Sequence, residues 1–166
     1  MSLSKVEQLI DVYSKYVAII EVPNLKSKIG AFGTFKVKNG KPYIFIDTDQ
    51  PEIDKRVILT EEFMHFLHSV GMILDKDNLN QRKQELQARN LTYKAVVSID
   101  DLLRCYLMGL ETPYDVASEL DLPEEFLKNA IDYFKTQYSK PFEYKGYVVI
   151  FSDTVNFYKN SIVKSV

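Results

Sequence analysis

Two adjacent glutamates and a nearby histidine, Glu61, Glu62 and His65, stand in the middle of the chain with the spacing of a metal-dependent hydrolase. The usual motif is H-E-x-x-H on a helix, in which two histidines one turn apart bind zinc and the glutamate beside the first activates water. Here Glu61 takes the position of the first histidine, Glu62 that of the base and His65 that of the second histidine. A carboxylate is an established zinc ligand. These residue types therefore predict a metal site with Glu62 as its general base.

A third ligand must come from another segment, because a catalytic zinc ion is held by three protein ligands with one position open. Glu85 is the best candidate, since it shares a stripe with Ala88 and Thr92 along which another helix can approach closely. A structural salt bridge is the plainer interpretation of Glu85. His68 lies three residues after His65 and thus near the same helical face. It is a fourth ligand, a hydrogen-bonding partner of a ligand, or a surface histidine, and the last two are favoured.

The composition of this ligand set bears on the choice of metal. Two glutamates and one histidine would neutralise Zn²⁺ and lower its Lewis acidity relative to a site with two histidines. Oxygen ligands also suit Mn²⁺ and Fe²⁺, so zinc is the expected ion and manganese or iron the alternatives. Taken alone, E-E-x-x-H is a weak signal, because glutamate pairs are common on helices.

The elements predicted around these residues strengthen the signal. A helix from residue 51 or 52 to residue 69 is apolar enough to be buried on most sides, and buried charges need a partner or a metal. Directly before it, segments 31–37 and 42–46 flank Asn39-Gly40, a pair that favours a hairpin turn. A later helix over 79–97 carries Glu85. The second hairpin strand is a candidate edge strand for an extended substrate, through Tyr43, Ile44, Phe45 and Ile46.

The remaining segments are predicted to be mainly helical. A stripe at 3- and 4-residue steps predicts a first helix over 4–20. Helix starts follow at Ser98 and Thr112-Pro113, and residues 121–124 have capping-box spacing. A short β-like run, Tyr147–Phe151, comes near the end. These patterns predict a helical C-terminal part.

Composition excludes several classes of protein. The net charge of -2 gives no basic footprint, and the helix-turn-helix look-alike near residue 124 begins with Glu124 and Glu125, which would repel phosphates. The single cysteine, Cys105, excludes an intramolecular disulfide and is expected to be a buried structural thiol. No signal-peptide pattern or membrane span is evident in the sequence. We therefore expect a cytoplasmic, monomeric protein that binds neither membranes nor nucleic acid directly.

Several of these motifs together resemble the ImmA/IrrE-type family of zinc metallo-endopeptidases, and in particular its branch from prophages and mobile elements. The matching segments are I-L-T-E-E-F-M-H over 58–65, S-V-G over 69–71, Q-E-L-Q-A-R over 84–89, and stretches over 99–102 and 114–120. In that branch a glutamate at the first ligand position is familiar. The chain departs from the usual pattern at Met64, where a small residue normally precedes the histidine, and lacks the first histidine of the wider family.

The resemblance implies a fold and a function. The fold would be α+β, with a zincin-like small metallopeptidase core of hairpin or sheet plus active-site helix over 1–97 and a helical C-terminal subdomain over 98–166, unless both form one compact domain. Glu61, His65 and Glu85 would be the metal ligands and Glu62 the base. The protein would cleave a partner regulator such as a phage-type repressor. The alternative is a metallopeptidase-like module that docks a regulator without cutting it.

Overall fold

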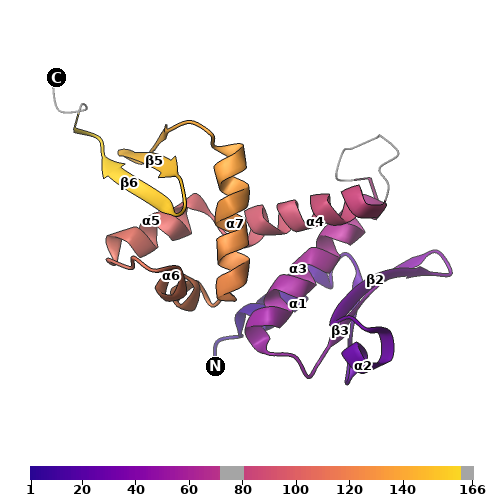
Figure 1. Cartoon of the computed structure of the whole chain (residues 1–166). Helices are drawn as coiled ribbons and strands as arrows, with labels where there is room; N and C mark the ends of the chain where they lie inside the picture. The colour runs from indigo at the N-terminus through magenta and orange to yellow at the C-terminus, as the bar shows by residue number, and fades with distance from the viewer. Residues whose placement is uncertain (72–80, 162–166) are drawn as a thin grey trace. The chain divides into compact units, whose positions relative to one another are not determined.

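The computed structural model describes residues 1–71 and 81–161 of the chain. It is an α+β fold, as the sequence predicts, and divides into two compact units, Met1–Val96 and Val97–Val166. Each unit contains its own three-stranded sheet, shown in Figure 1. Among the described helices, none combines the length and the apolar character that crossing a membrane requires.

The first unit builds a sheet whose middle strand is the last one in sequence. Its elements are α1 (Lys5–Tyr13), β1 (Ala18–Val22), α2 (Leu25–Ile29), β2 (Gly33–Lys38), β3 (Lys41–Asp47), α3 (Glu52–Ser69) and α4 (Gln81–Val96). Strand β3 pairs in parallel with β1 and antiparallel with β2, so the order is β1-β3-β2. The β2–β3 hairpin turns at Asn39 and Gly40, whose φ angles of 52° and 74° are those a tight turn between twisted strands demands.

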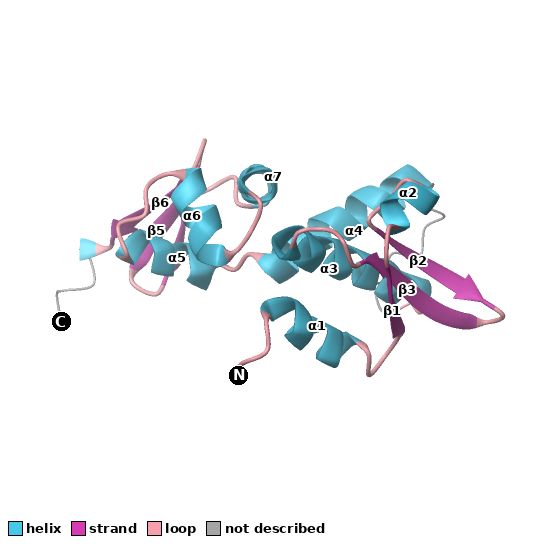
Figure 2. Ribbon diagram, turned by 90° about the horizontal axis from the view of Figure 1, so that it is seen from below, coloured by secondary structure: helices cyan, strands magenta, loops and turns pink. Residues whose placement is uncertain are grey.

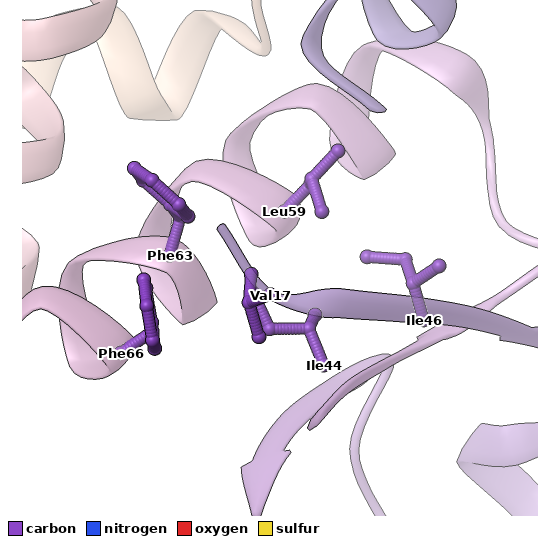
Figure 3. Packing of buried hydrophobic residues seen from close by; sticks show 6 residues of the cluster. All are labelled: Val17, Ile44, Ile46, Leu59, Phe63 and Phe66. Carbon is purple, nitrogen blue, oxygen red and sulfur yellow. The ribbon is translucent and has the colours of Figure 1, made fainter. Parts of the chain in front are cut away.

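The core of this unit lies between the sheet and α3. Helix α3 packs on β2 and β3, and α4 packs on α3 (Figure 2). The side chains that meet in this core are shared by the strands and by one face of the helix (Figure 3): Val17, Ile44, Ile46, Leu59, Phe63 and Phe66. Tyr13 of α1 stacks on Phe63 with ring centroids 3.8 Å apart. Burial of this apolar face fixes which side of α3 is turned away from the sheet.

This unit departs from the sequence prediction at the end of the first helix and between β1 and β2. The predicted first helix, 4–20, ends at Tyr13, and Ala18–Val22 is instead the strand β1. Short helix α2 was not predicted. Two acidic residues that precede α3 in sequence serve α2 instead. Asp47 Oδ2 accepts a hydrogen bond from the Lys26 N–H at 2.8 Å, and Asp49 Oδ2 accepts one from the Asn24 N–H at 2.7 Å. Helix α3 begins after Pro51 without a side-chain cap.

The second unit combines three helices with an antiparallel sheet. Its elements are α5 (Ile99–Leu107), α6 (Pro113–Leu120), α7 (Glu124–Gln137), β4 (Phe142–Tyr144), β5 (Tyr147–Phe151) and β6 (Val155–Lys159), with strand order β4-β5-β6. Leu102, Leu127 and Val149 are fully buried in its core, and Arg104 pairs with Glu119 across α5 and α6 at 2.6 Å. Cys105 of α5 is buried, and burial raises the pKa of its thiol.

Helix starts in this unit follow the predicted signals with one exception. Ser98 forms a capping box with Asp101, and the hydroxyl of Thr112 caps α6 by accepting the Asp115 N–H. Asp121, in contrast, adopts a left-handed φ of 51° and ends α6, so the capping box expected over 121–124 is absent and α7 starts after Pro123. Strands β4 and β6 were not predicted.

Candidate metal centre and its edge strand

Three of the predicted ligands come together where α3 and α4 pack on each other. Glu61, His65 and Glu85 each present one ligand atom, and these atoms all lie within 4.8 Å of one another. The His65 Nε2 atom is 3.4 Å from Glu85 Oε2. Ligand atoms of a tetrahedral zinc ion with bonds of about 2.0–2.1 Å lie roughly 3.3 Å apart, so this donor set fits zinc after a small side-chain adjustment.

The groups around Glu61 shift its pKa in both directions. Burial raises the pKa of Glu61; the positive charge of Arg89 and the neighbouring His65 lower it, and the carboxylate of Glu85 raises it again. Arg89 follows Glu85 by one helical turn and so reaches the same site. Arg89 was not predicted as a site residue, although its position one turn from a proposed ligand is a signal that the sequence contains.

Glu62 occupies the most strongly perturbed position of the site. Burial raises its pKa from 4.5 to about 7, and the charges of Glu61 and Glu85 push it in the same direction. The Phe35 N–H donates a hydrogen bond to the carboxylate and, together with Lys36, opposes this rise. A carboxyl group that titrates near neutrality is suited to accept and return a proton during a reaction. The pKa of Glu62 is thus matched to the role of general base.

A glycine allows strand β2 to approach this carboxylate. A Cβ atom at Gly33 would lie 2.5 Å from Ile58 Cγ2 and 3.2 Å from Glu62 Cγ, far inside normal contact distance with the first atom. Any larger residue would therefore push β2 away from α3. Because Phe35 follows two residues later on the same strand, the close approach at Gly33 also sets the distance from its N–H to Glu62.

The predicted substrate strand is wrong. Tyr43, Ile44, Phe45 and Ile46 belong to β3, which is the central strand and is paired on both sides. One of its edges is left unpaired in the sequence prediction, because the predicted helix over 4–20 covers part of β1. The edge next to Glu62 is that of β2, which pairs only with β3 among the described residues. The local hairpin pattern could not reveal which of its two strands lies at the edge.

His68 is not one of the three grouped donors. It lies on α3 beyond His65, and its Nε2 atom is buried without a hydrogen-bond partner among the described residues. Of the sequence-predicted site residues, the structure thus brings together Glu61, His65 and Glu85, places Glu62 on the adjoining β2 side, and leaves His68 outside the cluster.

Comparison with known proteins assigns the chain to a family. Residues 17–136 match Peptidase_M78, described as the IrrE N-terminal-like domain. This match covers most of the chain and includes β2, α3 and α4. The chain belongs to this family. It is a metallopeptidase family, which implies a metal cofactor, usually zinc, and a protein substrate. No curated protein and no solved structure gives a significant match.

Proposed function

We propose that the protein is a zinc-dependent endopeptidase in which Glu61, His65 and Glu85 hold the metal and Glu62 is the general base. The observation that carries this proposal is the convergence of three ligand atoms within 4.8 Å of one another, beside a carboxyl group whose pKa is about 7. Family membership supports the reaction class. Zinc, when bound, supplies a Lewis acid that polarises a carbonyl oxygen and lowers the pKa of water.

The residues of the chain would carry out the proton transfers. Glu62 takes a proton from the attacking water, whose oxygen forms a bond to the peptide carbonyl carbon. The carbon–nitrogen bond then breaks, and Glu62 returns the proton to the leaving amine. The free edge of β2 would bind the substrate as an added strand, so that main-chain hydrogen bonds place the peptide along α3. Binding at a strand edge recognises the extended backbone of the substrate. Which substrate side chains are preferred then depends on the surface beside the strand.

The substrate in this proposal is a partner regulator inside the cell, such as a phage-type repressor. This part rests on the resemblance of segments 58–65 and 84–89 to the prophage branch of the family. A second function, docking of a regulator without cleavage, is favoured by one observation: Glu61 replaces a histidine. The extra carboxylate lowers the Lewis acidity of a bound metal and so its ability to activate water.

Metal content tests the ligand set first. Chelator-treated protein reloaded with zinc should hold about one ion per chain by mass spectrometry, and Glu61→Ala, His65→Ala and Glu85→Ala should each lose it. Loss of affinity should exceed the roughly 10–100-fold effect of removing an outer hydrogen-bonding partner. His68→Ala is the matched control, because it removes an imidazole from the same helix and should keep the ion. Zinc retained in the three ligand variants would rule out this site.

Cleavage tests the role of Glu62. Glu62→Gln should abolish hydrolysis of a quenched-fluorescence peptide library and of co-expressed repressors while leaving zinc content unchanged. Cleavage that survives in this variant would show that another group is the base. A wild-type protein that binds zinc and a repressor but cuts neither substrate would support the docking function.

A further inference from the structure

A pocket of about 420 Å³ opens within the second unit, among residues that the metal centre does not use. Its size falls in the range of roughly 300–1,000 Å³ that is typical of ligand sites. Its walls come from α5, from α6 and the segment that leads into it, from α7 and from β6. The lining residues are mostly apolar, and include Leu102, Leu110, Val116, Leu127, Ile131 and Phe157. We call this pocket and the adjoining edge of β6 the β6 groove.

The groove follows the edge of a strand. Five consecutive residues, 154–158, line it. Successive side chains of a strand point to opposite faces, so a cavity that touches all five must run along the strand's edge. Strand β6 pairs with β5 on one side and has no second strand partner in the described part of the chain. The β6 edge is therefore open along the pocket.

The register of the sheet identifies the main-chain groups on this edge. The Asn160 N–H donates to the Gly146 carbonyl at 2.9 Å, and the Ser152 N–H donates to the Thr154 carbonyl at 2.8 Å. Hydrogen-bonded and non-hydrogen-bonded pairs alternate along an antiparallel ladder. The N–H and C=O groups of Val155 and Phe157 consequently point away from β5, toward the groove.

Two aromatic side chains that line the pocket are also exposed to solvent. Tyr106 and Tyr158, which line the pocket, are 45% and 56% exposed. Apolar residues exposed together in this way mark interaction surfaces more often than isolated ones do.

The second unit carries a net negative charge. Its described part, residues 97–161, holds eleven aspartates and glutamates against six lysines and arginines. Glu111 is the one charged residue among those that line the pocket. Such a surface repels phosphate and attracts cationic side chains. It favours a basic peptide over nucleic acid as the occupant.

We propose that the β6 groove binds an extended, basic and apolar segment of a partner protein. The segment adds a strand to β6 through the main-chain groups of Val155 and Phe157, inserts an aliphatic side chain into the pocket, and places a lysine or arginine beside Glu111. This recognition mode combines main-chain hydrogen bonds for affinity with a side-chain pocket for specificity. The site is independent of peptide cleavage and uses none of the residues assigned to the metal centre.

The test uses a defined probe and the full-length chain. The probe is the peptide acetyl-Lys-Val-Leu-Val-Lys-amide, and its control carries glutamate in place of both lysines. Titration at low salt, followed by amide NMR shifts, should move the signals of residues 154–158 and 110–112 with the lysine peptide only. Shifts confined to β2, or equal affinity for both peptides, would overturn the proposal, as would duplex DNA moving the same signals in place of the peptide.

Variants locate the binding to the groove. Glu111→Gln should weaken the lysine peptide roughly two- to fivefold, the range for an exposed ion pair. Glu125→Gln, the matched control, removes an equal charge from α7 outside the pocket lining and should leave affinity unchanged.

Val155→Pro removes one outward N–H at the first residue of the strand, where proline is tolerated, and should weaken binding severalfold. Equal effects of Glu111→Gln and Glu125→Gln would show that binding depends on the net charge of the unit and not on a contact with Glu111, and would overturn the proposal. Neither zinc nor cleavage enters the measurement, so its failure leaves the peptidase proposal standing.

Discussion

The two units place polar chemistry and apolar surface in opposite ways. In the first unit the apolar residues are gathered under the sheet, and the half-buried side of α3 and α4 carries Glu61, His65 and Glu85. In the second unit the cavity is lined mainly by apolar residues, and a single acid, Glu111, lines it. Reactive groups benefit from partial removal from water, because desolvation moves their pKa values toward neutrality. A recognition surface instead benefits from apolar groups left in contact with water, whose burial on binding releases free energy.

The two units also differ in how their charged groups affect stability. The first unit buries carboxyl groups whose ionisation destabilises the folded state, as the raised pKa of Glu62 shows. The second unit keeps its charged groups at the surface, where Arg104 and Glu119 pair. Changes to the cores should therefore act alike in both units, whereas changes of pH should act mainly on the first.

The largest expected effect comes from matched core truncations. Leu59 in the first unit and Leu127 in the second are both fully buried, so Leu59→Ala and Leu127→Ala should each lower the free energy of unfolding by about 2–5 kcal/mol. Amide hydrogen exchange should show the loss of protection in β3 and α3 for the first variant and in α7 and β5 for the second. Equal loss of protection throughout the chain in both variants would show that the two units unfold as one.

The pH dependence of stability should be smaller and confined to the first unit. The pKa of Glu62 is about 7 in the folded chain and near 4.5 when unfolded, so the folded state holds a proton that the unfolded state releases between these values. Stability of the metal-free protein should therefore fall as pH rises from 4.5 to 7, by about 2 kcal/mol once partial solvation is allowed for, and level off above. Urea unfolding across this range measures the slope, and Glu62→Gln should remove most of it, the raised pKa of Glu61 accounting for the remainder. An unchanged slope in the variant would assign it to other groups.

The smallest expected effect is a coupling energy between two substitutions, and it tests the approach of β2 to α3. Gly33→Ala should destabilise the first unit by about 1–3 kcal/mol, because the new Cβ would overlap Ile58 Cγ2. Ile58→Ala removes that atom, so the double variant should be more stable than the sum of the single effects predicts, by roughly 1 kcal/mol in a double-mutant cycle. Strictly additive effects would mean that the backbone absorbs the added methyl group elsewhere.

Much of the fold was predictable because its signals are local. The Asn39-Gly40 turn, the Ser98 capping box and the Thr112 cap depend on neighbours within a few residues, and each is observed. Ala18–Val22 was not predictable in the same way, because its helix-like spacing continues from α1 and only parallel pairing with β3 makes it a strand. Asp121 shows a third case, in which a residue suited to start one helix instead ends the preceding one.

The residues of the candidate site also differ in whether local spacing or contacts between distant segments position them. Glu61, Glu62 and His65 share one helix, so their spacing alone placed them together, and the small-residue stripe indicated where Glu85 would meet them. The contribution of β2 could not be inferred, because the contacts of Gly33 with Ile58 and of Phe35 with Glu62 join segments that are distant in sequence. Which strand forms the edge likewise depends on β1, far from the motif.

Cys105 gives the second unit a natural reporter. It is the only thiol in the sequence, it is 1% exposed, and burial raises its pKa, so the folded unit protects it from thiol-reactive reagents twice over. Its rate of alkylation therefore counts the openings of this unit alone, with no label to introduce and no signal from the metal centre. The same protection means that oxidising conditions should leave the Cys105 thiol of the native chain unmodified and oxidise it only in molecules whose second unit has opened.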